Sequence, residues 1–208
     1  MNQQVATPTR LDTEVRSGKL PSRSITIRDL RFLRGAQPQR WWLGGDPFAT
    51  AWFTALSATF PRGEAFFIEA VKAHRDSVPP QLAEQIRLFI VQEVNHSREH
   101  LALNRIAEAA GYDLVGIDRH VSEMLDQLKG RPVILDLAST MALEHFTAMM
   151  AHEFLAHPEH LGGTDPEVAA LWRWHAIEEI EHKAVAYDTW LHATRDWSRW
   201  KRWRVKSL

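Results

Sequence analysis

Glutamate and histidine side chains recur in this chain at the spacing that places them on one face of a helix. Two apolar stretches carry the motif Glu-x-x-His, and one of them has a further histidine four residues before its glutamate. Two other apolar stretches carry a single inward glutamate each. Residues three or four positions apart are neighbours on a helix surface, so each motif directs its side chains at one place. The seven residues are Glu64, Glu93, His96, Glu144, His175, Glu179 and His182.

A buried carboxylate is costly unless it is paired or coordinates a metal. One carboxylate from each of two helices and a Glu-x-x-His pair from each of two others is the arrangement by which a four-helix bundle holds two iron or manganese ions. The sequence therefore predicts a dinuclear centre with two Fe ions, a mixed Mn/Fe pair or Zn being the alternatives. A single buried histidine is more often a hydrogen-bonded core residue, so the prediction depends on the complete set.

Several neighbouring residues have plainer interpretations. His100 continues the stripe one turn beyond His96, and we expect it to contact a ligand from outside the centre. Glu178 and Glu181 lie off the stripe, where we expect them to be solvated or paired with arginines. Glu153-x-x-x-His157 is a chance match of similar shape. A group of apolar residues are candidates for a substrate pocket, although such residues at helical spacing are more often core: Phe66, Phe67, Phe89, Phe146 and Met149.

The elements that must position these residues are helices. Stretches with a period near 3.6 are separated by proline and glycine, and Asp46-Pro47 and Asp165-Pro166 have the sequence of a helix start. Pro61 predicts an interruption between two shorter helices. The fold class is all-α, a four-helix bundle with additional short helices. The expected helices are 46–59, 62–76, 81–110, 115–128, 132–157 and 165–194.

Charge divides the chain into three parts. Residues 1–40 carry eight basic and three acidic side chains, and residues 195–208 carry six and one. The middle, residues 41–194, holds eleven basic and twenty-two acidic side chains. We expect a basic N-terminal arm that is flexible over residues 1–24, with a short extended segment at residues 25–33, then the metal-binding bundle, then a basic tryptophan-rich tail.

Composition excludes several classes of site. The chain has no cysteine, so disulfides, thiolate zinc sites and iron–sulfur clusters are ruled out. No stretch reaches the 18 or so consecutive apolar residues typical of a membrane-spanning helix, and the first residues are too polar for a secretory signal. We expect a cytoplasmic protein.

The tail alternates tryptophan with arginine and lysine in RDWSRWKRWRVKSL. The acidic charge of the bundle favours packing of the tail on the body, and a peripheral contact with an anionic membrane surface comes second. Nucleic acid is not expected as a partner, because the acidic body would repel it. Whether the chain forms a homodimer stays open.

Two resemblances follow from these residues. The order Glu, Glu-x-x-His, Glu, His-x-x-x-Glu-x-x-His resembles the seven-ligand signature of the ferritin-like di-iron arylamine N-oxygenases. The surrounding sequence resembles a bacterial family described as predicted metal-dependent hydrolases. Members of that family continue past the last histidine motif, so we expect this chain to be a shortened member or a fragment. The segments that carry the second resemblance are WWLGGDPFATAWFTALSATFPRGEAFF (41–67), FIVQEVNHSREH (89–100), ALEHFTA (142–148) and LWRWHAIEEIEHKAVAYD (171–188).

The resemblances imply a ferritin-like bundle and two competing functions. In the first, a di-iron oxygenase or oxidase activates O2 and oxidises a small organic substrate, with an electron donor protein as partner. In the alternative, two metals activate water for hydrolysis. We favour the oxygenase, because a ligand set rich in imidazole inside a helix bundle is unlike the aspartate-rich sites of most two-metal hydrolases.

Overall fold

The computed structural model describes residues 24–35 and 39–206, and within them it contains helices and no β-strand. The flexible arm expected at residues 1–24 lies, but for its last residue, outside the described part. The fold class is therefore all-α, as expected. The helices are α2 (Pro47–Lys72), η1 (Arg75–Ser77), α3 (Pro80–Ala109), α4 (Val115–Asp126), α5 (Val133–Ala156), η2 (Pro158–Leu161), α6 (Pro166–His182), α7 (Val185–Ala193) and α8 (Arg199–Lys206).

Two aspartates cap helices as the sequence predicts. The Oδ1 atom of Asp46 accepts hydrogen bonds from the backbone N–H groups of Phe48 (2.8 Å) and Ala49 (3.1 Å) at the start of α2. Asp165 does the same for Glu167 (2.9 Å) at the start of α6. A proline follows each aspartate at the first helical position, where its missing N–H has no helical partner to lose.

The predicted break at Pro61 is wrong, because α2 runs through it as one helix of 26 residues. A proline inside a helix leaves the carbonyl four residues earlier without its donor, here Ser57. The side-chain amide of Asn104 on α3 donates to that carbonyl at 3.2 Å. A neighbouring helix thus satisfies the acceptor that Pro61 leaves free, and the helix continues.

The last long helix predicted at residues 165–194 is divided into α6 and α7 by a short turn. The turn at Lys183 and Ala184 follows His182 directly. No proline or glycine lies there, so composition gives no sign of this break.

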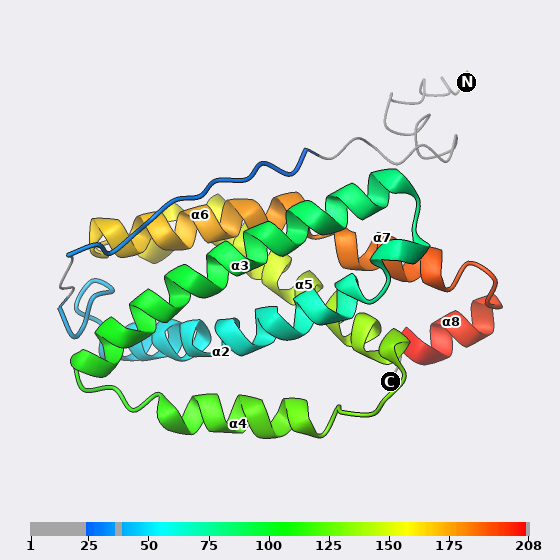
Figure 1. The fold of residues 1–208 in the computed structure, drawn as a ribbon. Coiled ribbons are helices and arrows are strands. Elements are labelled where there is room, and N and C mark those ends of the chain that lie inside the picture. Colours follow the sequence, from blue (N-terminus) through cyan, green and yellow to red (C-terminus); the bar gives the residue numbers. More distant parts are fainter. Residues whose placement is uncertain (1–23, 36–38, 207–208) are drawn as a thin grey trace, which may run out of the picture.

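The bundle consists of α2, α3, α5 and a fourth helix formed by α6 and its continuation α7 (Figure 1). Helix α2 packs on α3 and α5, and α6 and α7 pack on the same two helices. Two apolar clusters fill the interior. One includes Phe53, Leu103 and Trp172, and the other includes Ile86 and Trp190. The inward glutamates and histidines lie between these clusters along each helix, so apolar packing closes both sides of the polar region.

The segment of residues 24–35 is extended and lies along α3 and α6, as expected (Figure 1). Side-chain carboxylates hold its backbone. Glu181 accepts from the N–H of Thr26 at 3.0 Å, and Glu99 accepts from the N–H of Phe32 at 2.8 Å. Because Ile25 and Phe32 are also buried, the segment is part of the bundle surface.

Helix α5 is, among the described residues, the one helix long and apolar enough to cross a membrane by length and composition. A core helix passes the same test. Glu144 lies in the middle of α5, is 1% exposed and faces the other helices of the bundle. We therefore treat α5 as a bundle helix that also exposes apolar side chains.

The tail forms α8, which contacts α5, but two of its tryptophans keep more than half of their surface exposed. Trp200 and Trp203 are 63% and 55% exposed, and their rings stack on each other at 4.8 Å between centroids. The expectation of packing is wrong for these two residues.

The burial of side chains predicts that two leucines of α5 contribute very differently to the free energy of unfolding. Leu137 is completely buried, whereas Leu155 is 37% exposed. We expect Leu137→Ala to lower the free energy of unfolding by about 2–5 kcal/mol through lost contacts and a cavity. The control Leu155→Ala should cost less than about 1 kcal/mol. Urea unfolding followed by circular dichroism measures both, and equal losses would contradict the assignment of the core.

Candidate metal centre

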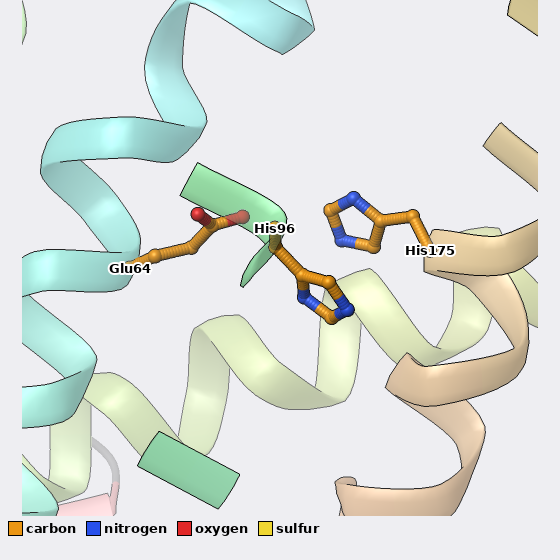
Figure 2. Close-up of side chains that lie close together, drawn as sticks. All are labelled: Glu64, His96 and His175. Atoms are coloured by element: carbon orange, nitrogen blue, oxygen red, sulfur yellow. The ribbon is translucent and has the colours of Figure 1, made fainter. Parts of the chain in front are cut away.

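The seven predicted ligands come together in the middle of the bundle. They arise from α2, α3, α5 and α6, and none is more than 4% exposed. Figure 2 shows three of them, Glu64, His96 and His175, converging from three different helices. Ligand-type atoms lie within 4.8 Å of one another in three overlapping groups, which together contain every predicted ligand. The groups are Glu64, His96 and His175; Glu93, His96 and Glu179; and Glu93, Glu144 and His182.

His182 shows how closely the carboxylates approach an imidazole. Its Nε2 atom lies 3.0 Å from Oε1 of Glu93, 3.4 Å from Oε1 of Glu179 and 3.5 Å from Oε2 of Glu144. Three carboxylates from three helices thus surround one ring nitrogen.

Many buried polar atoms of this cluster have no hydrogen-bond partner. In both Glu93 and Glu144 neither carboxylate oxygen has one, and Nε2 of His182 also lacks one. Buried polar groups are almost always hydrogen-bonded, so unsatisfied atoms gathered in one place need an explanation. Carboxylate oxygens and imidazole nitrogens are ligand atoms for Fe, Mn and Zn. The residues therefore fit a dinuclear metal group.

Two of the three histidines each form a hydrogen bond with a residue of the opposite helix, on the side of the ring that faces away from the centre. His96 of α3 donates from Nε2 to Glu178 of α6 at 3.1 Å, and His182 of α6 donates from Nδ1 to Gln92 of α3 at 3.0 Å. The Gln92 amide nitrogen donates to the carbonyl of Thr26, which leaves its oxygen as the acceptor for His182. In the neutral ring each histidine keeps its proton on the outer nitrogen and turns a bare nitrogen to the carboxylates. Metal-ligating histidines are held in this way.

The third histidine is held by a chain of hydrogen bonds. Nδ1 of His175 lies 2.6 Å from Nε2 of His100, and Nδ1 of His100 lies 2.9 Å from Oγ of Ser57. The Ser57 hydroxyl donates to Oδ1 of Asn104 at 2.7 Å, and the Asn104 amide nitrogen donates to the Ser57 carbonyl.

The direction of this chain is fixed from its far end. Asn104 uses its N–H on a carbonyl, so its oxygen must accept, and the Ser57 oxygen is left to accept from Nδ1–H of His100. Nε2 of His100 then accepts from Nδ1–H of His175. Nε2 of His175 lies at hydrogen-bond distance, 2.9 Å, from Oε1 of Glu179. In a neutral His175 with its proton on Nδ1, this Nε2 is the nitrogen that would be left for a metal. The expected contact of His100 with a ligand is thus present.

Burial and the charges of neighbouring groups shift the pKa values of these ligands away from their ordinary values. Burial, together with the charge of Glu93, raises the pKa of Glu64 well above its ordinary value. Burial and the charge of Glu179 do the same to the pKa of Glu144. Burial by itself lowers the pKa of an imidazole, but the hydrogen bond to Glu178 and the nearby charge of Glu93 raise the pKa of His96 to about 10.

The remaining ligands follow the same balance. For His182 burial is again opposed, here by the charges of Glu179 and Glu93, which raise its pKa well above the ordinary value. Burial and the charge of His96 lower the pKa of His175. Burial alone raises the pKa of Glu93 and Glu179, but the charge of His182 and the contacts with the other histidines together outweigh it and lower both. Without metal, the cluster reduces its charge by holding protons.

Glu178 pairs with an arginine, as expected, but it is buried and not solvated, and it also holds a ligand. Glu178 is completely buried, accepts from the Trp174 indole at 3.0 Å and holds His96, while Arg28 is a more distant partner at 3.4 Å. Glu181 also pairs with Arg28, at 2.6 Å.

Sequence reasoning also missed Gln92, Ser57 and Asn104 as partners of the centre. A signal for the outer partners was present, since a long polar residue precedes the glutamate of each Glu-x-x-His motif. The chance match at Glu153 and His157 forms an exposed group with His160 on the surface.

Metal uptake should release protons. His96 holds its proton at neutral pH because its pKa is about 10, so this proton competes with the metal. Raising the pH removes the competition, and the apparent affinity should rise about tenfold per pH unit for each proton displaced. Calorimetric titration of metal-free protein with Fe(II) at pH 7, in buffers of different ionisation enthalpy, counts the protons. A binding enthalpy independent of the buffer would contradict this expectation.

The series of hydrogen bonds from His175 through His100 to Ser57 predicts that His100 supports metal binding without touching the metal. His100→Phe keeps a ring in the core but removes the acceptor for Nδ1–H of His175, so metal affinity should fall about 10–100-fold. His145→Phe changes an exposed histidine of α5 and should leave affinity unchanged. Competition with a chromophoric chelator measures both variants, and equal affinities would remove His100 from this role.

Comparison with known proteins bears directly on this cluster. The family described as predicted metal-dependent hydrolase matches residues 26–207. No curated protein and no solved structure matches the chain. The resemblance to the di-iron arylamine N-oxygenases is not confirmed by these comparisons. The match covers nearly all of the described residues, and with them all four helices that carry the ligand-type side chains: the chain belongs to the predicted metal-dependent hydrolase family.

Proposed function

We propose that this protein is a dinuclear metal enzyme, with two iron ions as the resident metals, that uses O2 to oxidise a small organic substrate. The observation that carries the proposal is the state of the three histidines. Each has one ring nitrogen bound to an outer partner and the other turned toward buried carboxylates.

The chain's own residues would divide the work in a simple way. Glu64, His96 and His175 would hold one metal, and Glu93, Glu144 and His182 the other, with Glu179 between the two groups. Two reduced iron ions would supply the electrons and the binding site for O2. The apolar clusters on both sides keep bulk water away from the centre.

Hydrolysis is the second candidate, and the family description fits it better than oxidation does. A pair of metals can lower the pKa of a bound water and orient it for attack. Against this stands the closed, apolar surrounding of the centre, since a hydrolase must admit water and release polar products. We propose oxidation as the main function for that reason.

Metal analysis and oxygen uptake test the proposal together. Protein from iron-supplemented cells should contain close to two irons per chain, and the anaerobically reduced protein should consume O2 when a reductant is supplied. Protein with all seven side chains intact that takes up only zinc, does not consume O2 and hydrolyses chromogenic esters would establish the hydrolase instead.

Replacement of His175 tests the seven-ligand set. His175→Ala should lower the iron content and slow oxygen uptake at least about tenfold, because one ligand and its hydrogen-bonded chain are lost. The exposed His152→Ala on α5 is the matched control and should behave like the unmodified protein. Unchanged iron content and oxygen uptake in His175→Ala would reduce the centre to six ligands.

The proposal includes an electron donor protein and a cytoplasmic location. Peripheral contact with an anionic membrane through α8 is part of it, supported by the exposed Trp200 and Trp203 beside basic residues.

A further inference from the structure

A large cavity lies between α4, α2 and α5. Its volume is about 600 Å³, which falls within the range of pockets that bind small organic molecules. Helix α4 forms one wall with Val121, Met124 and Leu125. Of the residues proposed from the sequence, Phe66, Phe67 and Phe146 also line it, whereas Phe89 belongs to the core and Met149 lines a different pocket.

The walls of this cavity carry no acidic, lysine or arginine side chain. The polar side chains that line it are Thr59, His120 and Thr147. A charged ligand would lose its hydration here without gaining a partner of opposite charge. The walls therefore favour an uncharged molecule with a long apolar part.

The cavity lies beside the metal centre. A second, much smaller cavity of about 20 Å³ is lined by His175 and Glu179. The two cavities share Leu56, Phe60, Thr147 and Met150 as lining residues. The Phe60 ring lies 4.7 Å from the His175 ring, between centroids, so a single layer of side chains separates the large cavity from a predicted ligand.

Two glycines leave the cavity open. Gly63 in α2 and Gly116 in α4 both line it, and a Cβ atom added to either would meet no heavy atom within 4 Å. Neither has a backbone angle that requires glycine. Glycine is unfavourable inside a helix relative to alanine or leucine. A Cβ atom at either position would meet open space, so the missing side chains add to the free volume beside these glycines.

We infer that this cavity binds an uncharged substrate with a long alkyl chain and presents one end of it, past Phe60 and Thr147, to the metal centre. The presentation to metal rests on the proposed function, whereas binding in the cavity does not. The substrate class is thus aliphatic and neutral, such as a medium-chain alcohol, aldehyde or hydrocarbon.

Calorimetry with 1-decanol on metal-free protein tests the binding. We expect saturable one-to-one binding, and decanoate, with the same chain length and a charge, should bind at least tenfold more weakly. Gly63→Leu should reduce decanol affinity at least tenfold by filling the cavity, while Gly63→Ala should keep it. Both variants should unfold at or above the original temperature, since each removes a glycine from a helix. Equal decanol affinity in Gly63→Leu and Gly63→Ala, or none in the unmodified protein, would overturn the inference.

A paramagnetic measurement tests the approach to the centre. In protein loaded with Co(II), proton resonances at one end of bound decanol should broaden more than those at the other, relative to protein loaded with Zn(II). Uniform, metal-independent line widths would overturn presentation to the metal. If the protein binds neither metal, the proposed function fails, and the calorimetric comparison of the two Gly63 variants still decides whether the cavity binds decanol.

Discussion

The structure depends on the burial of four carboxylates in the middle of a helix bundle. Glu64, Glu93, Glu144 and Glu179 are each less than 5% exposed. Burial and their mutual repulsion in a region of low dielectric raise the pKa of Glu64 and Glu144, and the repulsion is opposed by charges placed among the four. Protons on His96 and His182 provide part of this compensation, and metal cations would provide all of it. The apolar clusters on either side make the constraint stricter, because they exclude the water that would otherwise solvate the acids.

This constraint explains why α3 and α6 are joined by a reciprocal pair of contacts. Gln92 of α3 holds His182 of α6, and Glu178 of α6 holds His96 of α3. Sliding one helix along the other would break both contacts and misdirect both rings. The extended segment reinforces the arrangement from outside, since Thr26 accepts from Gln92 and Arg28 pairs with Glu178. The relative register of the two helices is therefore part of the centre.

Helical periodicity was sufficient to predict the fold class and the seven side chains that share one place. The apolar face of each helix, which becomes buried, can be identified from the sequence of that helix alone. The outer partners were harder to predict. Glu178 and Gln92 lie off the inward stripe of their own helices and act on a histidine of the opposite helix, which only the packing of α3 against α6 reveals. The continuity of α2 at Pro61 was missed for a related reason, since the donor that makes it tolerable comes from another helix. The turn after His182 has no local cause in its residue types.

Pro61 has a consequence for how the centre responds to change in α2. Any other residue at this position would bring its own backbone N–H to the Ser57 carbonyl, which would then no longer depend on the Asn104 amide for a donor. An amide released from that carbonyl is free to rotate, and its oxygen would no longer be obliged to accept from the Ser57 hydroxyl. The donor and acceptor roles in the hydrogen bonds through His100 would then no longer be fixed, and His175 would lose its preference for one tautomer. Pro61, which contacts no ligand, thus determines which ring nitrogen of His175 carries the proton.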